Sequence, residues 1–103
     1  MQNQNFVQLE LPFVKDMNPL IQMQQAIQSM LDLTWNAVLV HISKPATKEL
    51  LRQHGKLMAL SDGEAWIKVS SPHIFKLVQS KISDLETAFI NGFGIPVKIN
   101  LSC

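Results

Sequence analysis

The stretch Leu57–Val69, LMALSDGEAWIKV, marks a change in the periodicity of the sequence. A short apolar run ends at Leu60, and Ser61–Glu64 contains the Asp-Gly pair that is typical of tight hairpin turns. Ala65–Val69 then resumes with apolar and polar side chains in partial alternation, as in a half-buried strand. We therefore predict a β-hairpin, and the rest of the fold is expected to form around it.

On the carboxyl-terminal side, Ser71 and Pro72 begin a predicted helix that Gly92 and Gly94 end. Its apolar side chains recur every three or four residues and so lie on one face: Phe75, Val78, Ile82, Leu85, Phe89 and Phe93. The segment 96–101 reads as a final strand. The residues expected to be buried together are Trp35, Phe75, Val78, Ile82, Leu85 and Phe89.

On the amino-terminal side, Asn18 is a suitable cap and Pro19 a suitable first residue for a helix that ends near residues 41–43. We expect its apolar positions to form one packed face: Leu20, Met23, Ile27, Met30, Leu31, Thr34, Trp35, Val38 and Leu39. A second helix begins at Pro45 and stops at Gly55.

The predicted order is helix, helix, strand, strand, helix, strand. This order indicates an α+β fold in which a small KH-like sheet of about three strands is packed by helices on one face. Residues 17–103 are expected to form a single interaction domain. Residues 1–16, rich in Gln and Asn and broken by Pro12, form a flexible or edge-strand segment.

Composition excludes several classes of protein. With 103 residues, a net charge of +1 and one cysteine, the chain is neither a strongly basic nucleic-acid binder nor a disulfide-rich secreted protein. Its apolar stretches are far shorter than the roughly 20 residues that span a bilayer. We therefore expect a cytoplasmic protein with no membrane partner. Its histidines are scattered, with no second ligand or nucleophile at a useful spacing, so we expect no catalytic residues, no metal site and no cofactor.

Basic side chains recur every four residues from Lys44 through Lys48 to Arg52, with Lys56 just beyond. On a helix this spacing forms a row on one face. Such a row suits phosphate groups or an acidic partner. A solvated face, whose charge is offset by Glu49 and nearby carboxylates, accounts for it equally simply.

About two-thirds of the chain consists of three successive segments: TWNAVLVHI, PATKELLRQHGKLMAL and EAWIKVSSPHIFKLVQSKISDLETAFINGFGIPVKINL. This succession resembles the carboxyl-terminal region of the bacterial, and especially cyanobacterial, DNA polymerase III subunit gamma/tau. The shared features are the opening Trp, the Leu-Leu-Arg-Gln helix, the Phe-Lys-Leu helix start and the closing Val-Lys-Ile strand. A helicase-loading family of replication proteins with a KH-like module has a similar pattern.

The resemblance implies a non-catalytic protein-interaction module of the bacterial DNA replication machinery, within a DNA polymerase III assembly. In the gamma/tau subunit this region follows a clamp-loader core and tethers the polymerase subunit or the replicative helicase. The alternative is a small KH-like nucleic-acid-binding module that uses Lys44, Lys48, Arg52 and Lys56 on the phosphates of DNA. Phosphate binding would fall steeply with salt, whereas an apolar protein interface would change little.

The segment QLELPF at residues 8–13 has two interpretations. Gln8, Leu9, Leu11 and Phe13 resemble the hexapeptide form of the motif that binds the bacterial sliding clamp, in which the Gln and the terminal apolar pair enter pockets on the clamp. The same apolar residues alternate with polar ones as in an edge strand, the only strand position that Pro12 permits.

Overall fold

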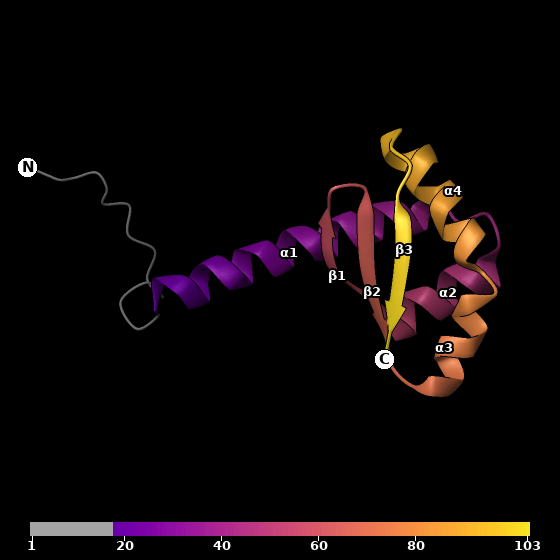
Figure 1. The fold of residues 1–103 in the computed structure, drawn as a ribbon, viewed down its shortest axis with the longest axis horizontal. Coiled ribbons are helices and arrows are strands. Elements are labelled where there is room, and N and C mark those ends of the chain that lie inside the picture. The colour runs from indigo at the N-terminus through magenta and orange to yellow at the C-terminus, as the bar shows by residue number, and fades with distance from the viewer. Residues whose placement is uncertain (1–17) are drawn as a thin grey trace, which may run out of the picture.

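The computed structural model describes residues 18–103. Its elements, in chain order, are α1 (Pro19–Val40), α2 (Pro45–His54), β1 (Gly55–Ser61), β2 (Glu64–Val69), α3 (Pro72–Gln79), α4 (Ile82–Phe93) and β3 (Lys98–Ser102). Figure 1 shows the three strands as one sheet with the helices behind and beside it. The α+β class and the order predicted from the sequence are confirmed, except that two short helices replace the last predicted helix.

The predicted hairpin is present, and its turn is Asp62-Gly63. Both turn residues have positive φ angles, 50° and 76°, as a two-residue hairpin turn requires. β1 pairs antiparallel with β2, and β2 pairs parallel with β3, so that β2 is the central strand. The register of the hairpin shifts by one residue between Leu57 and Ala59, where Met58 forms a β-bulge.

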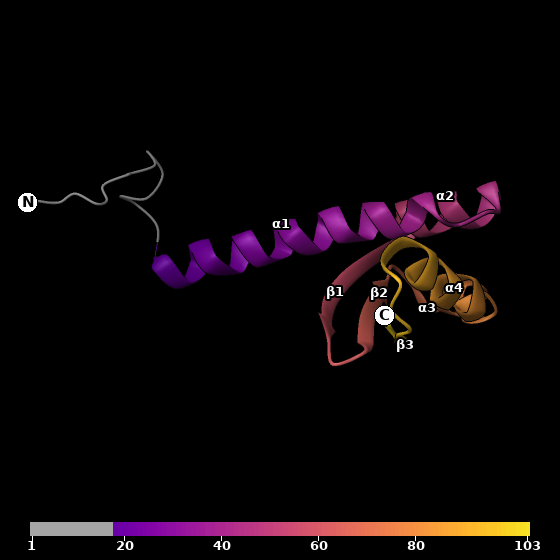
Figure 2. The ribbon, with the colours of Figure 1, turned by 90° about the horizontal axis from the view of Figure 1, so that it is seen from above.

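One face of the sheet is covered and the other is open. In β2, Ala65, Ile67 and Val69 are buried, whereas the alternate residues Trp66 and Lys68 are exposed. Figure 1 looks onto the open face, with α1 passing behind the strands, and Figure 2 shows the same arrangement from above. Within the described part of the chain, no helix covers the open face. The core therefore lies between the covered face and the helices.

The core holds most of the residues predicted for it. Trp35, Val78, Leu85 and Phe89 are buried in one apolar cluster. Phe75 and Ile82 are only partly buried and pack against the edge of this cluster. Phe93, which continues the same spacing, remains 44% exposed and lies outside the core.

The prediction of one continuous helix from Pro72 to Phe93 is wrong. α3 begins at the predicted cap, where the Ile74 amide donates to Ser71 Oγ at 3.2 Å, and it ends at Gln79. The Ser80 hydroxyl donates to the Leu77 carbonyl at 2.8 Å, and the chain turns before α4 begins at Ile82. An unbroken helix over this segment would be about 33 Å long, far longer than the five-residue strand β3. The break keeps both halves against the sheet.

The predicted packed face of α1 is confirmed only in its carboxyl-terminal half. The helix begins as expected, since the Leu20 amide donates to Asn18 Oδ1 at 2.7 Å. Trp35, Val38 and Leu39 are buried. The first half of α1 extends past the edge of the sheet, as Figure 1 shows, because a helix of 22 residues is longer than three strands are wide. Its large apolar side chains are therefore left largely exposed in the described part of the chain.

Candidate interaction surfaces

An apolar row follows the exposed half of α1. It consists of Leu20, Met23, Ile27 and Met30, which are 59%, 58%, 51% and 67% exposed. Their spacings of three, four and three residues place them on one face of the helix. We call these four residues the α1 row. Large apolar side chains in a continuous row differ from the scattered apolar residues of an ordinary surface and are typical of an interaction site.

The α1 row leads toward an apolar pocket of about 300 Å³. Thr34, the next residue at the same spacing, lines this pocket from α1. Leu60 lines it from the end of β1, and Phe93 and Ile95 line it from the end of α4 and the segment that follows. These last three side chains are 40%, 44% and 54% exposed. Row and pocket together form an apolar surface that spans the end of the hairpin.

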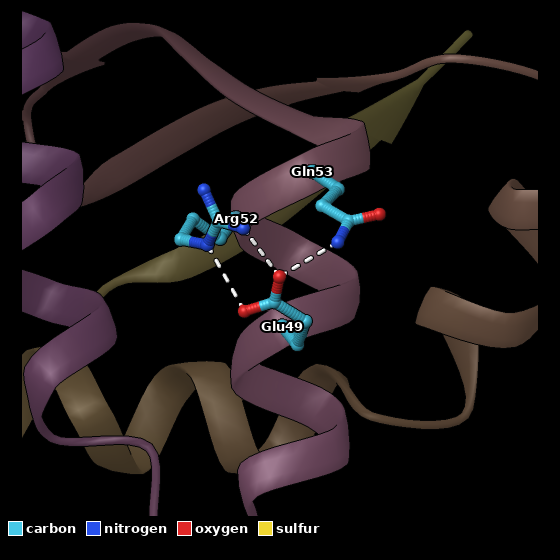
Figure 3. Close-up of polar contacts among 3 residues, drawn as sticks. All are labelled: Glu49, Arg52 and Gln53. Carbon is cyan, nitrogen blue, oxygen red and sulfur yellow. Dashed lines mark hydrogen bonds and ion pairs between the residues drawn. The ribbon is translucent and has the colours of Figure 1, made fainter.

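The basic row predicted from the sequence begins on α2, where Arg52 has a partner already. Its guanidinium donates two hydrogen bonds to the Glu49 carboxylate, one of them from Nε at 3.0 Å, and the Gln53 amide donates to the same carboxylate at 2.6 Å. Figure 3 shows the three side chains on one side of α2. The hydrogen bonds from Arg52 and Gln53 lower the pKa of the Glu49 carboxyl to about 2, and Glu49 raises the pKa of Arg52. The charge of Arg52 is therefore largely offset.

Lys44 also lies near a carboxylate, with 3.9 Å between its Nζ atom and Asp84 Oδ2 on α4. Lys48 is partly buried against the body of the protein. These contacts favour the interpretation of the α2 part of the row as a solvated face whose charge is balanced, and not as a phosphate-binding site. Lys48 and Arg52 do share α2, as their spacing predicts, whereas Lys44 is the extended residue that precedes the helix.

Lys56 lies apart from these three. It is exposed on β1 and alternates with Leu57, which is buried on the covered face, so that Lys56 points to the open face of the sheet. Its direct partner across the hairpin is Lys68 on β2. Lys68 and its neighbour on the same face, Trp66, were not among the candidate residues from the sequence, although the alternation in Ala65–Val69 places them opposite the core.

The clamp-type residues Gln8, Leu9, Leu11 and Phe13, and the segment 1–16 that contains them, lie outside the described residues. Between residues 18 and 103, no group of three His, Cys, Asp or Glu side chains is arranged to hold a metal ion. Cys103 is a free thiol at the surface.

Comparison with known proteins adds one finding. Residues 22–103 match the model of the family described as STICHEL, DnaA_N-like alpha-beta domain. The chain belongs to this family. The match begins within the exposed half of α1 and runs through the last strand, so that it includes the α1 row from Met23 onward, the sheet and the other three helices.

Membership in this family supports the coarser part of the sequence interpretation, a replication-related interaction domain of the DnaA amino-terminal type. The family description does not name the gamma/tau subunit. Neither a curated protein nor a solved structure matched the chain. None of the helices in residues 18–103 is both long enough and apolar enough to cross a membrane.

Proposed function

We propose that this chain is a non-catalytic protein-interaction module of the bacterial DNA replication machinery that acts in the cytoplasm. The observation that carries the proposal is the α1 row, whose four large apolar side chains are all more than half exposed. Family membership supports the replication context. The resemblance of residues 34–101 to the gamma/tau carboxyl-terminal region supports a place in a DNA polymerase III assembly, where the module would tether another component.

The geometry of the α1 row indicates how a partner binds. Apolar residues at positions i, i+3, i+7 and i+10 are the pattern by which a helix enters an apolar groove on another protein. Burying such side chains stabilises a complex by roughly 1.5–3 kcal/mol for each one that becomes fully covered. The partner is a replisome protein: the polymerase subunit, the replicative helicase or the sliding clamp.

A double substitution on α1 tests the proposal. Met23→Glu with Ile27→Glu places two charges in the row, at positions that are more than half exposed and lie outside the core cluster. The matched control is Gln25→Glu with Ser29→Glu, which adds the same charges at exposed positions on the opposite side of the helix. Binding to the three purified partners is measured by surface plasmon resonance, and stability by thermal unfolding.

We expect at least one partner to bind the parent and the control, and to bind the row variant at least tenfold more weakly at an unchanged thermal midpoint. If the row variant binds as the parent does, or if the parent binds none of the three, the proposal is wrong. Salt provides a further check, because an apolar interface changes little between low and moderate ionic strength.

A further inference from the structure

The open face of the sheet carries an arrangement of charge that the core does not explain. Lys56 and Lys68 are direct partners across the antiparallel strands β1 and β2, and both are exposed. Like charges in this position repel each other and destabilise a hairpin. Within residues 18–103, neither amine forms an ion pair with a carboxylate. An anion placed between the two amines would relieve the repulsion.

Trp66 lies on the same face, two residues before Lys68 on the central strand. Its side chain is 38% exposed although it stands in the middle of a three-stranded sheet. Its cross-strand partners are Ala59 on β1 and Asn100 on β3. The methyl group of Ala59 is too small to cover the neighbouring indole, in keeping with the exposure of the ring. The neighbouring carboxylate of Glu64 accepts a hydrogen bond from Asn100 at 3.0 Å and is thereby turned toward β3.

The distance between the two features follows from the strand itself. Residues two apart on a strand are about 6.6 Å apart, so the lysine pair lies one short step from the indole. A flat, exposed aromatic ring beside paired amines is the combination that binds a single-stranded nucleic acid, since the ring stacks on a base and the amines contact phosphates. At the other end of the face, Lys98 on β3 is the register partner of Glu64, so the positive charge of the face is concentrated at Lys56 and Lys68.

We infer that the open face of the sheet binds single-stranded nucleic acid, with one base stacked on Trp66 and the adjoining phosphates held by Lys56 and Lys68. This site is separate from the α1 row and from the basic residues of α2. It does not depend on the proposed protein partner. A duplex does not fit the site, because its bases are stacked on one another and present no free face to the indole.

The test uses the full chain and fluorescently labelled oligonucleotides of 15 nucleotides, dT and rU, with a DNA duplex of equal length. Binding is measured by anisotropy at several salt concentrations. The variants are Trp66→Thr, which suits a strand but cannot stack, Trp66→Phe, which retains an aromatic ring, and Lys68→Glu. Lys76→Glu, at an exposed position on α3, is the control for charge alone. Lys48→Glu tests the α2 residues. Thermal unfolding of every variant confirms that it is folded.

We expect the parent to bind a single strand in preference to the duplex. Trp66→Thr should weaken that binding at least about fivefold, the lower range for loss of one stacked base, whereas Trp66→Phe should retain most of it. Lys68→Glu should weaken binding and lower the slope of log K against log salt by about 0.7 for each phosphate that the variant no longer neutralises. Lys76→Glu should have little effect. The dT and rU arms decide whether DNA or RNA is preferred.

The inference is overturned if the parent binds neither single strand at low salt, in which case the face is free for a protein. It is also overturned if Trp66→Thr binds the single strand as tightly as Trp66→Phe does. The same holds if Lys48→Glu weakens binding and Lys68→Glu does not. If Trp66→Thr proves unfolded, quenching of the parent's tryptophan fluorescence by unlabelled dT decides the matter. Because Trp35 is buried, only Trp66 can be quenched by a stacked base. If the tryptophan emission stays unchanged when the protein is saturated with oligonucleotide, no base stacks on Trp66.

Discussion

Gly55 and Trp35 are in such close contact that a side chain at residue 55 would crowd the indole. A Cβ atom at Gly55 would lie 3.2 Å from Cζ2 of the indole and 3.0 Å from the Leu51 carbonyl oxygen. The backbone of Gly55 is extended, with φ −119°, so any residue would be acceptable there on conformational grounds alone. The glycine expected from the sequence to stop a helix is therefore favoured by packing and not by its backbone conformation.

Gly55→Ala should lower the free energy of unfolding by about 1–3 kcal/mol, the usual cost of forcing an extra carbon into a packed site. Urea unfolding followed by circular dichroism measures this. Gly92→Ala is the comparison, because its Cβ would meet the exposed ring of His41 at 3.0 Å, which can turn away, and alanine favours the helix. Equal effects from both substitutions would contradict the role assigned to Trp35 and Leu51.

Phe89 and Phe93 are one helical turn apart on α4, but their contributions to stability should differ. Phe89 is 1% exposed in the core and Phe93 is 44% exposed at the apolar pocket, with 6.5 Å between the two ring centroids. Phe89→Ala should cost about 3–5 kcal/mol, because it leaves a cavity among buried side chains. Phe93→Ala should cost under about 1 kcal/mol, since an exposed side chain leaves no enclosed cavity. Similar losses in thermal unfolding would show that the core extends to the end of α4.

The acidity of Glu49 provides a test of the polar contacts on α2. Its pKa is lowered to about 2 from an ordinary value of 4.5, first by the hydrogen bond from Arg52 and then by that from Gln53. Because the pKa of Glu49 is lower in the folded protein than in the unfolded chain, ionised Glu49 stabilises the folded state above pH 4.5. This stabilisation is lost as the pH falls toward 2 and the carboxyl becomes protonated. Arg52→Met should move the pKa of Glu49 up toward 4.5, whereas Lys48→Met should leave it low. Carbon-detected NMR of the Glu49 carboxyl measures both, and a pKa that stays low in Arg52→Met would rule out the contact as the main cause.

The clamp-type peptide at residues 8–13 can be tested on one variant, Leu11→Ala with Phe13→Ala. If the segment binds the sliding clamp, this change should abolish clamp binding and leave the thermal midpoint unaltered, because the two side chains serve only the partner. If the segment is an edge strand, the same change should destabilise the protein by roughly 1.5–3 kcal/mol for each side chain that is buried. Affinity and stability measured together separate the two interpretations.

The elements that depend on neighbours in sequence were predictable. The Asp62-Gly63 turn, the Asn18 cap and the Ser71 cap each need only a few adjacent residues, and each is present. The break between α3 and α4 was not predictable in the same way, since Ser80 and Lys81 interrupt a regular apolar spacing without any Gly or Pro. It is imposed by the short sheet against which both helices pack.

The candidate surfaces were only partly predictable for a related reason. Periodicity identified an apolar face on α1, but it cannot say how far the sheet reaches along that face, so the exposure of Met23 and Ile27 was missed. The spacing of Lys48 and Arg52 gave their common helix correctly, and Glu49 was expected to offset the row, but the spacing could not show that Asp84 on α4 lies near Lys44. Lys56 was grouped with these residues because it continues their four-residue spacing. It lies on β1, however, and its side chain points to the open face of the sheet.

The bulge at Met58 divides the hairpin into two frames. From the turn to Ala59, paired residue numbers add up to 125, as in Ser61 with Glu64, whereas from Leu57 onward they add up to 124, as in Lys56 with Lys68. Deleting Met58 would preserve every one of these pairs and merge the two frames. Deleting Lys56 or Leu57 would instead leave the pairs nearer the turn intact, but the frames could merge only if Met58 took the place of Leu57 opposite Ile67. The hairpin can therefore lose one residue without changing a partner only at its bulge.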